Sequence, residues 1–122
     1  MRRPTTASAM REIQRGDVAW ADFSPTRGRE QAGERPAVIV ASNDYLESVP
    51  HLVIALPVTT VDRGWTHHVR LMGAVELPRP SWALTEQPRA ISRDRLIRSA
   101  GHVSARCQTE IDQWLRDFLG LH

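Results

Sequence analysis

Two short runs of apolar residues place the strongest constraint on what this chain can fold into. Residues 36–41 (PAVIVA) and residues 51–56 (HLVIAL) are rich in aliphatic and β-branched side chains. Runs of this length and composition are typical of strands that are buried on both faces. The second run continues into a Pro-Val-Thr-Thr segment, residues 57–60. We therefore expect a folded core built around these two strands.

Weaker strand patterns surround this pair. Small, apolar and β-favouring residues predict further strands near residues 17–23, 68–72, 82–86 and 97–103. The stretch from residue 24 to residue 34 is charged and contains proline and glycine, which predicts a long loop. About five short strands separated by proline and glycine turns favour a small β-barrel.

The C-terminus carries a helical pattern instead. Apolar residues recur there at the spacing of one helix face: Val103, Cys107, Ile111, Trp114, Leu115, Phe118 and Leu119. Ser104 is a suitable N-cap and Gly120 a suitable terminating residue. These features predict one amphipathic helix of about four turns that lies on the barrel. Because Trp114 and Cys107 belong to the apolar stripe, we interpret them as core residues rather than as a ligand platform and a reactive thiol.

Length and composition limit the class of protein. A chain of 122 residues is expected to form one domain. Residues 1–12 are basic and no apolar stretch follows them, so we interpret them as a flexible N-terminal arm and residues 13–122 as a single domain. No apolar run approaches the roughly 18 residues of a membrane span. A single cysteine, Cys107, agrees with a reducing compartment, and we expect a cytoplasmic protein with no membrane association.

The basic residues are unusual in kind. The net charge is only +2, but all 16 basic residues are arginines. Compositional bias accounts for most of this pattern. The physical consequence remains, because the guanidinium fork grips phosphate oxygens in pairs and stacks on bases, which a lysine ammonium does not do. The charge is compatible with a polyanionic partner but does not identify one.

The sequence lacks the usual apparatus of catalysis. His67 and His68 are adjacent, so in a strand their rings are expected to point to opposite faces, and no other histidine has a helpful spacing. We therefore expect no metal site and no cofactor. Nucleophile elbows, Walker loops and dinucleotide-binding glycine motifs are also absent from the sequence. If the chain is an enzyme, its substrate must supply part of the mechanism.

Three segments resemble a known family. Residues 15–40 (RGDVAWADFSPTRGREQAGERPAVIV) are very similar to the opening of MazF/PemK toxins, in which an R-G-D strand leads into a D-P-T-x-G-S-E-Q-A-G-x-R-P loop. Residues 57–60 (PVTT) resemble the P-x-T-T strand end of the family, and residues 86–91 (EQPRAI) resemble its E-Q-x-R-x-I element. The resemblance extends from about residue 13 into the C-terminal helix.

This resemblance implies a fold and a function. The fold would be mainly β with α, an α+β arrangement in which an SH3-like β-barrel of the CcdB/MazF type carries the C-terminal amphipathic helix. The protein would be a homodimer that cleaves single-stranded RNA with some sequence preference and is restrained by a cognate antitoxin. Arg35 and Thr59 match the catalytic pair of the family. Further residues match positions that line or shape the RNA groove: Glu30, Gln31, Gln87 and Arg89.

Two departures from the family pattern affect base preference. Arg29 stands where the family usually has serine, which adds a cation at the mouth of the site. Pro88 lies inside the E-Q-x-R element and removes a backbone donor there. Neither departure changes the proposed catalytic pair.

A mechanism without a metal is consistent with these residues. RNA carries its own nucleophile, the 2′-hydroxyl beside the scissile phosphate, and the protein has to orient it, stabilise charge and move protons. Arg35 suits charge stabilisation, whereas a guanidinium is almost never deprotonated and is an awkward base. Thr59 can donate to the phosphate or to the leaving oxygen. Glu30 is either the general base or an ion-pair partner of Arg35, and both alternatives stay open.

The predicted RNA contacts are cations, amides, a hydroxyl and one aromatic ring: Arg27, Arg29, Gln31, Thr60, Trp65, Gln87 and Arg89. Trp65 lies in a Gly-Trp-Thr loop and is a candidate for stacking on an unpaired base. Trp20 is expected to pack in the barrel instead.

Two other classes of function remain as alternatives. The same fold hosts CcdB-like toxins that bind DNA gyrase without catalysis, and fold alone does not exclude this. The second alternative is an inactive module that binds RNA or an antitoxin. The sequence does not specify which bases are recognised, or whether messenger, ribosomal or transfer RNA is the target.

Overall fold

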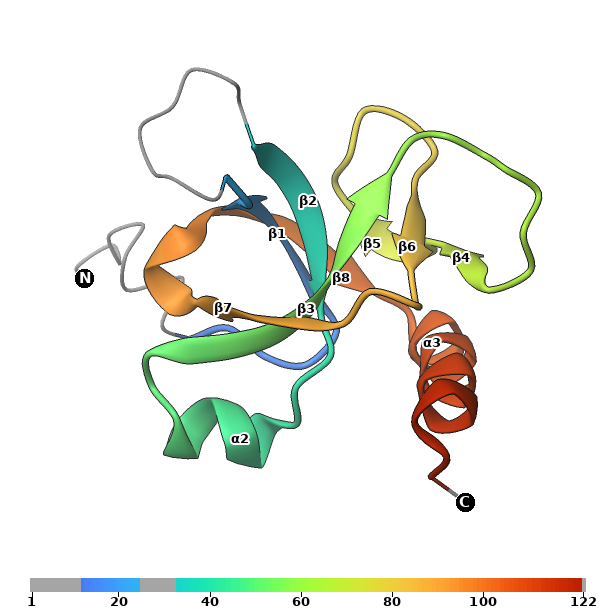
Figure 1. Cartoon of the computed structure of the whole chain (residues 1–122). Coiled ribbons are helices and arrows are strands. Elements are labelled where there is room, and N and C mark those ends of the chain that lie inside the picture. The colour runs from blue at the N-terminus through green and yellow to red at the C-terminus, as the bar shows by residue number, and fades with distance from the viewer. Residues whose placement is uncertain (1–11, 25–32, 122) are drawn as a thin grey trace.

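A computed structural model describes residues 12–24 and 33–121 and contains eight strands and three helices (Figure 1). The strands are β1 (Asp17–Asp22), β2 (Glu34–Ile39), β3 (Leu52–Thr59), β4 (His68–Arg70), β5 (Gly73–Val75), β6 (Trp82–Leu84), β7 (Arg89–Ser92) and β8 (Leu96–Val103). The helices are α2 (Asn43–Ser48), the 3-10 turn η1 (Arg93–Arg95) and α3 (Ala105–Leu119). None of the described helices is long and apolar enough to cross a membrane.

The strands form one antiparallel sheet in the order β4-β6-β3-β2-β1-β8-β5. The first half of β3 also pairs with β7, while its last two residues, Val58 and Thr59, pair with β6. The sheet curls strongly (Figure 1), but within the described residues no ladder joins its outer strands β4 and β5. The predicted α+β fold class is confirmed, with the barrel-like sheet left open.

The central strands are buried on both faces, as their continuous apolar runs predict. Ala37 and Ile39 of β2 face one cluster of buried residues, the first core cluster. Val38, between them, faces the other, the second core cluster. Alternate side chains of a strand point to opposite faces, so a strand with a core on each side needs apolar residues throughout. Each fully buried aliphatic side chain contributes roughly 1.5–3 kcal/mol.

Helix α3 has the predicted ends. The Ser104 hydroxyl accepts a hydrogen bond from the Cys107 amide at 3.2 Å, and Gly120 ends the helix with φ of 69°. Cys107 and Ile111 are buried in the second core cluster, which confirms their predicted place. Phe118 and Leu119 are 47% and 60% exposed. The apolar stripe therefore covers the sheet over its first turns and leaves its last turn uncovered.

Helix α2 and strands β5 and β7 were not predicted from the sequence. The Ser42 hydroxyl accepts a hydrogen bond from the Tyr45 amide at 3.0 Å and begins α2. In Figure 1, α2 lies beside the beginning of β3, whereas α3 lies beside β4. A six-residue helix and a three-residue strand are too short to produce a clear hydrophobic period.

Candidate active site

The first two predicted catalytic residues lie on neighbouring strands. Arg35 is the second residue of β2, and Thr59 is the last residue of β3. The two strands are antiparallel, and the last residues of their ladder at this end are Ala37 and Pro57. If this register is extended by two residues, Arg35 lies opposite Thr59, and both side chains fall on the same face of the sheet. Beyond Pro57, however, β3 pairs with β6, so the strands part where these two side chains lie.

Arg35 is exposed and has no internal partner in the described part of the chain. Its backbone pairs with Ala21 of β1. Across residues 12–24 and 33–121, no hydrogen bond or ion pair engages its guanidinium. All five donors of an arginine in this state are available to a ligand from solution.

The hydroxyl of Thr59 is oriented by the backbone. Its Oγ1 accepts a hydrogen bond from the Val61 amide at 3.1 Å. A hydroxyl has one hydrogen to donate besides its acceptor lone pairs, so this contact leaves the Thr59 hydrogen free. Thr60, predicted to contact RNA, is exposed beside it.

A second arginine lies on the same side of the sheet. Arg89 begins β7 and is opposite Ala55 of β3, which faces the same core cluster as Ala37. Its Cζ atom lies 5.0 Å from the centre of the Phe23 ring, a cation–π distance. Phe23 therefore helps to position Arg89, a role that sequence reasoning missed because the two residues are far apart in the sequence. Gln87 is exposed two residues before Arg89.

The connection between β1 and β2 is held at its base by several contacts. The Phe23 amide donates to the Gly33 carbonyl at 2.8 Å, and the Ser24 amide donates to Asp22 Oδ1 at 2.9 Å. Arg95 donates to the carbonyls of Asp22 and Ser24 at 3.0 and 2.5 Å. Sequence reasoning missed Arg95, since its acceptors are backbone atoms more than 70 residues away. The remaining predicted residues of this connection lie outside the described residues: Arg27, Arg29, Glu30 and Gln31.

Trp65 is exposed but belongs to a different neighbourhood. Its ring stacks on His67, with centroids 5.6 Å apart and planes 20° apart. Arg63 lies over the same ring at 5.7 Å. His67 in turn makes edge contacts with Trp114 and Phe118 of α3. The structure therefore groups Trp65 with α3, and among residues 12–24 and 33–121 no ring contact links it to the Arg35 side of the sheet. Trp20 packs against the second core cluster, as predicted.

The expectation that His67 and His68 point to opposite faces is wrong. Their ring centres are 4.8 Å apart, and both rings reach Glu86. His67 precedes β4, so strand alternation does not apply to it. Burial pushes the pKa of Glu86 up, but its own backbone amide, His68 and the Gln87 amide together hold that pKa below its usual range.

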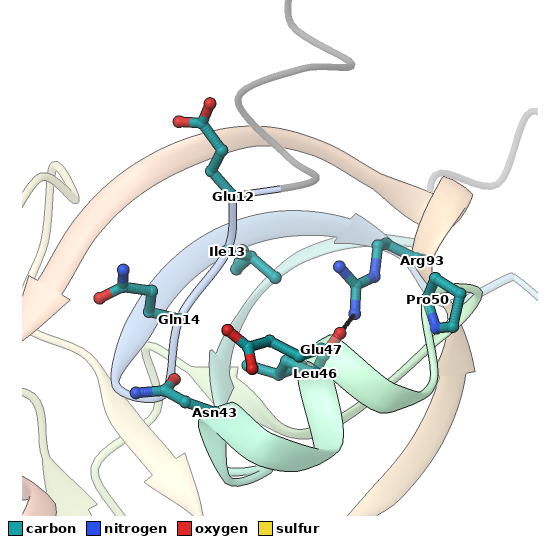
Figure 2. A pocket seen from close by; sticks show the side chains of 8 residues that line it. All are labelled: Glu12, Ile13, Gln14, Asn43, Leu46, Glu47, Pro50 and Arg93. Carbon is teal, nitrogen blue, oxygen red and sulfur yellow. Dashed lines mark hydrogen bonds between the residues drawn. The ribbon is translucent and has the colours of Figure 1, made fainter.

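A cavity of about 700 Å³ lies elsewhere, between the first described residues and α2 (Figure 2). Arg93 reaches across it and donates to the Leu46 carbonyl at 2.8 Å and to the carbonyls of Val49 and Leu52 at 3.4 Å. These hydrogen bonds from Arg93 hold the end of α2 and the start of β3 together. None of the predicted site residues that the structure describes lines this cavity, so we do not assign the active site to it.

Comparison with known families agrees with this arrangement. The sequence profile of the PemK-like, MazF-like toxins of type II toxin–antitoxin systems matches residues 14–119. The chain belongs to this family. The matched segment includes Arg35 of β2, Thr59 of β3, the connection between β1 and β2, and all of α3.

Individual members of the family are similar over different lengths. The endoribonuclease toxin MazF of Escherichia coli K12 is 38% identical over 77 residues, which cover 63% of this chain and 66% of that protein, just under two thirds. The endoribonuclease MazF of Staphylococcus saprophyticus is 30% identical over 112 residues, 90% of this chain and 93% of that protein. Among solved structures, a MazE–MazF crystal structure from Deinococcus radiodurans has a TM-score of 0.75 at 27% identity and covers 90% of this chain and 97% of that chain.

Proposed function

We propose that this chain is a metal-independent endoribonuclease toxin that cleaves single-stranded RNA with some sequence preference. The observation that carries the proposal is the position of Arg35 and Thr59 on adjacent strands, two residues beyond the last paired residues Ala37 and Pro57. The Arg35 guanidinium has no partner among the described residues, and the Val61 amide orients the Thr59 hydroxyl. Membership of the MazF-like toxin family and the names of its endoribonuclease relatives support the same assignment.

The chemistry uses a nucleophile that the substrate already contains. The 2′-oxygen of the ribose attacks the adjacent phosphorus and loses its proton to a base. The bond from phosphorus to the 5′-oxygen breaks, and that oxygen takes up a proton. The products are a 2′,3′-cyclic phosphate and a 5′-hydroxyl end. The protein has to hold the in-line geometry and stabilise the charge that builds on the phosphorane.

Arg35 and Thr59 divide these tasks. The fork of Arg35 bridges two phosphate oxygens and neutralises the developing charge. Thr59 donates its free hydroxyl hydrogen to a phosphate oxygen or to the leaving 5′-oxygen, while the Val61 amide keeps the hydroxyl oriented. Glu30 acts as the base or as the ion-pair partner of Arg35, and it lies outside the described residues.

Further groups beyond this pair are proposed to contact the RNA strand. Arg89, supported by Phe23, supplies a cation on the Arg35 side of the sheet, and Gln87 supplies an amide. Thr60 and Trp65 lie along the β3–β4 connection. Three predicted contacts belong to the β1–β2 connection outside the described residues: Arg27, Arg29 and Gln31.

The partners we propose are a second copy of the chain and a cognate antitoxin, and the compartment is the cytoplasm. Phe118, Leu119 and Leu121 at the end of α3 are each about half exposed, and exposed apolar residues that gather in this way mark interaction surfaces. An isologous homodimer would cover such a surface with itself. A solved relative that contains MazE together with MazF supports an antitoxin partner.

Cleavage of a defined RNA in the presence of EDTA tests the proposed function. We expect cutting with cyclic-phosphate and 5′-hydroxyl ends, and no cutting of a substrate that carries one 2′-deoxy substitution at the cleaved position. Normal cleavage of the deoxy substrate would overturn the 2′-hydroxyl mechanism. Absence of any cleavage would favour a gyrase-binding toxin or an inactive binding module. Light scattering that showed a monomer at micromolar concentration would contradict the dimer.

A further inference from the structure

Three side chains that the proposed cleavage does not use meet beside β4. His67 Nε2 lies 3.6 Å from Glu86 Oε1, and His68 Nε2 lies 3.2 Å from Glu86 Oε2. One metal-ligating atom of each residue lies within 4.8 Å of the others. Two segments distant in sequence, the start of β4 and the turn after β6, are thereby brought to one place.

The spacing suits a small divalent ion. Zinc binds histidine nitrogen at about 2.0–2.1 Å and carboxylate oxygen at about 2.0–2.2 Å, so the ligand atoms of a tetrahedral site lie roughly 3.3–3.5 Å apart. The two nitrogen–oxygen distances at Glu86, 3.2 and 3.6 Å, run to different carboxylate oxygens, and each is close to that separation. The three ligand atoms now lie within 4.8 Å of one another, so binding one ion requires them to draw closer together.

The donor set and its surroundings favour zinc over other ions. Two imidazoles and a carboxylate suit zinc, whereas magnesium and calcium prefer oxygen ligands throughout. His68 is almost wholly buried, which fixes one ligand, while His67 and Glu86 keep 27% and 31% of their side-chain surface exposed. An ion can therefore enter from solvent, and water can take the fourth position.

We propose that His67, His68 and Glu86 bind one zinc ion per chain at a site separate from the catalytic pair. Such an ion ties the β3–β4 connection to the turn that carries Gln87. It has no part in the proposed cleavage, which needs no metal.

The second nitrogen of His68 limits the affinity. Facing an ionised carboxylate, a neutral His68 carries its proton on Nε2, and zinc has to displace that proton to Nδ1. Nδ1 is buried, and no hydrogen bond engages it in the described residues. Most zinc-bound histidines donate their second nitrogen to an acceptor. We therefore expect moderate affinity and a chain that folds without the ion.

Zinc binding to the full chain, prepared without a histidine tag and stripped with chelator, tests the site. Isothermal titration with zinc chloride is expected to give one ion per chain, and cobalt substitution is expected to give the visible absorption of a tetrahedral site. His67→Ala and Glu86→Gln are each expected to weaken zinc binding at least tenfold, since even loss of a supporting group around a metal costs about 10–100-fold. Thermal unfolding without zinc checks that both variants fold.

His51→Ala and His102→Ala are the matched controls, because both residues are exposed histidines outside the cluster. Both controls are expected to bind zinc as the wild type does. Unchanged binding in His67→Ala and Glu86→Gln, or a loss in either control variant, would show adventitious surface binding and overturn the site. The measurement involves no RNA, so its result is independent of whether the chain is a ribonuclease.

Discussion

The two polar regions of this molecule differ in how far their side chains satisfy one another. Arg35 lies where β2 and β3 part, and no described residue engages its guanidinium. At the other region, His67 and His68 both turn inward onto Glu86. An unengaged arginine offers all of its donors to a ligand, whereas a ligand at the histidine cluster has to replace contacts that already exist. The first arrangement suits binding and stabilising a transient charge, and the second suits holding a cation.

The two regions also differ in what supports them. Around Arg35 the support is mostly backbone, through the Phe23–Gly33 hydrogen bond and the carbonyls to which Arg95 donates. Around His67 the support is a group of rings that includes Trp65 and Trp114. Five predictions, taken from the largest expected effect to the smallest, test this contrast.

Replacing Arg35 is expected to have the largest effect. Arg35→Ala should lower kcat by about 10²–10³, roughly 2.7–4 kcal/mol, because a donor aimed at the developing charge is lost. Arg35→Lys keeps the charge but loses the fork, and should be nearly as impaired. Single-turnover cleavage at saturating RNA measures both. Arg79→Ala, which removes an exposed arginine from another loop, is the control and should cleave normally.

Thr59→Ala is expected to fall in the same range or slightly below it. The change removes the hydroxyl that the Val61 amide orients. Thr59→Ser keeps the hydroxyl and should retain most of the activity. The comparison of the two cleavage rates isolates the hydroxyl from the methyl group, and a serine variant as impaired as the alanine variant would contradict the donor role.

Gly33→Ala tests the backbone support at the base of the β1–β2 connection. A Cβ at this position would lie 2.4 Å from the Ser24 nitrogen, so the chain has to move. We expect a loss of about 1–3 kcal/mol in the free energy of unfolding, together with slower cleavage. Gly120→Ala is the comparison, since nothing lies within 4 Å of its added Cβ. It should lose stability through its positive φ without changing the cleavage rate.

Arg29→Ala should act on binding rather than on chemistry. The family resemblance implies that Arg29 adds a cation at the mouth of the site. Its removal should weaken RNA binding severalfold and reduce the slope of log affinity against log salt concentration by about one. The single-turnover cleavage rate at saturating RNA, which reports the chemical step, should stay close to that of the wild type. If this rate fell for Arg29→Ala and held for Arg35→Ala, the roles of the two arginines would be reversed.

Cys107 is expected to show the smallest effect, because it faces neither region. Burial raises the pKa of its thiol; the Met72 backbone opposes this rise, and the charge of Glu110 adds to it. Thiolate is the reactive form, so alkylation should be much slower in the folded protein than in denaturant, and should accelerate only at high pH. Rapid alkylation at neutral pH would mean that α3 opens readily.

Much of the fold could be predicted from the periodicity of apolar residues. The rest could not, because some elements are too short to show a period and some contacts join distant segments. The run at residues 36–41 identified a doubly buried strand, and the stripe from Cys107 to Leu115 identified α3 with its Ser104 cap. Helix α2 escaped prediction because six residues do not span two helical turns. The roles of Phe23 and Arg95 also escaped it, since both depend on partners far away in sequence.

The sequence by itself determined the class of this protein. Its continuous runs and its helical stripe of apolar residues predict which elements are buried, and its loop and strand-end motifs mark the family. The same motifs single out Arg35 and Thr59 as the predicted catalytic pair. Only the tertiary structure decided which side chains from distant segments contact one another. His67 and His68 were expected to diverge, yet both converge on Glu86, because His67 lies outside the strand and the turn after β6 folds back beside it. Local patterns fix the conformation of neighbouring residues, whereas contacts between distant segments depend on how the strands are ordered in the sheet.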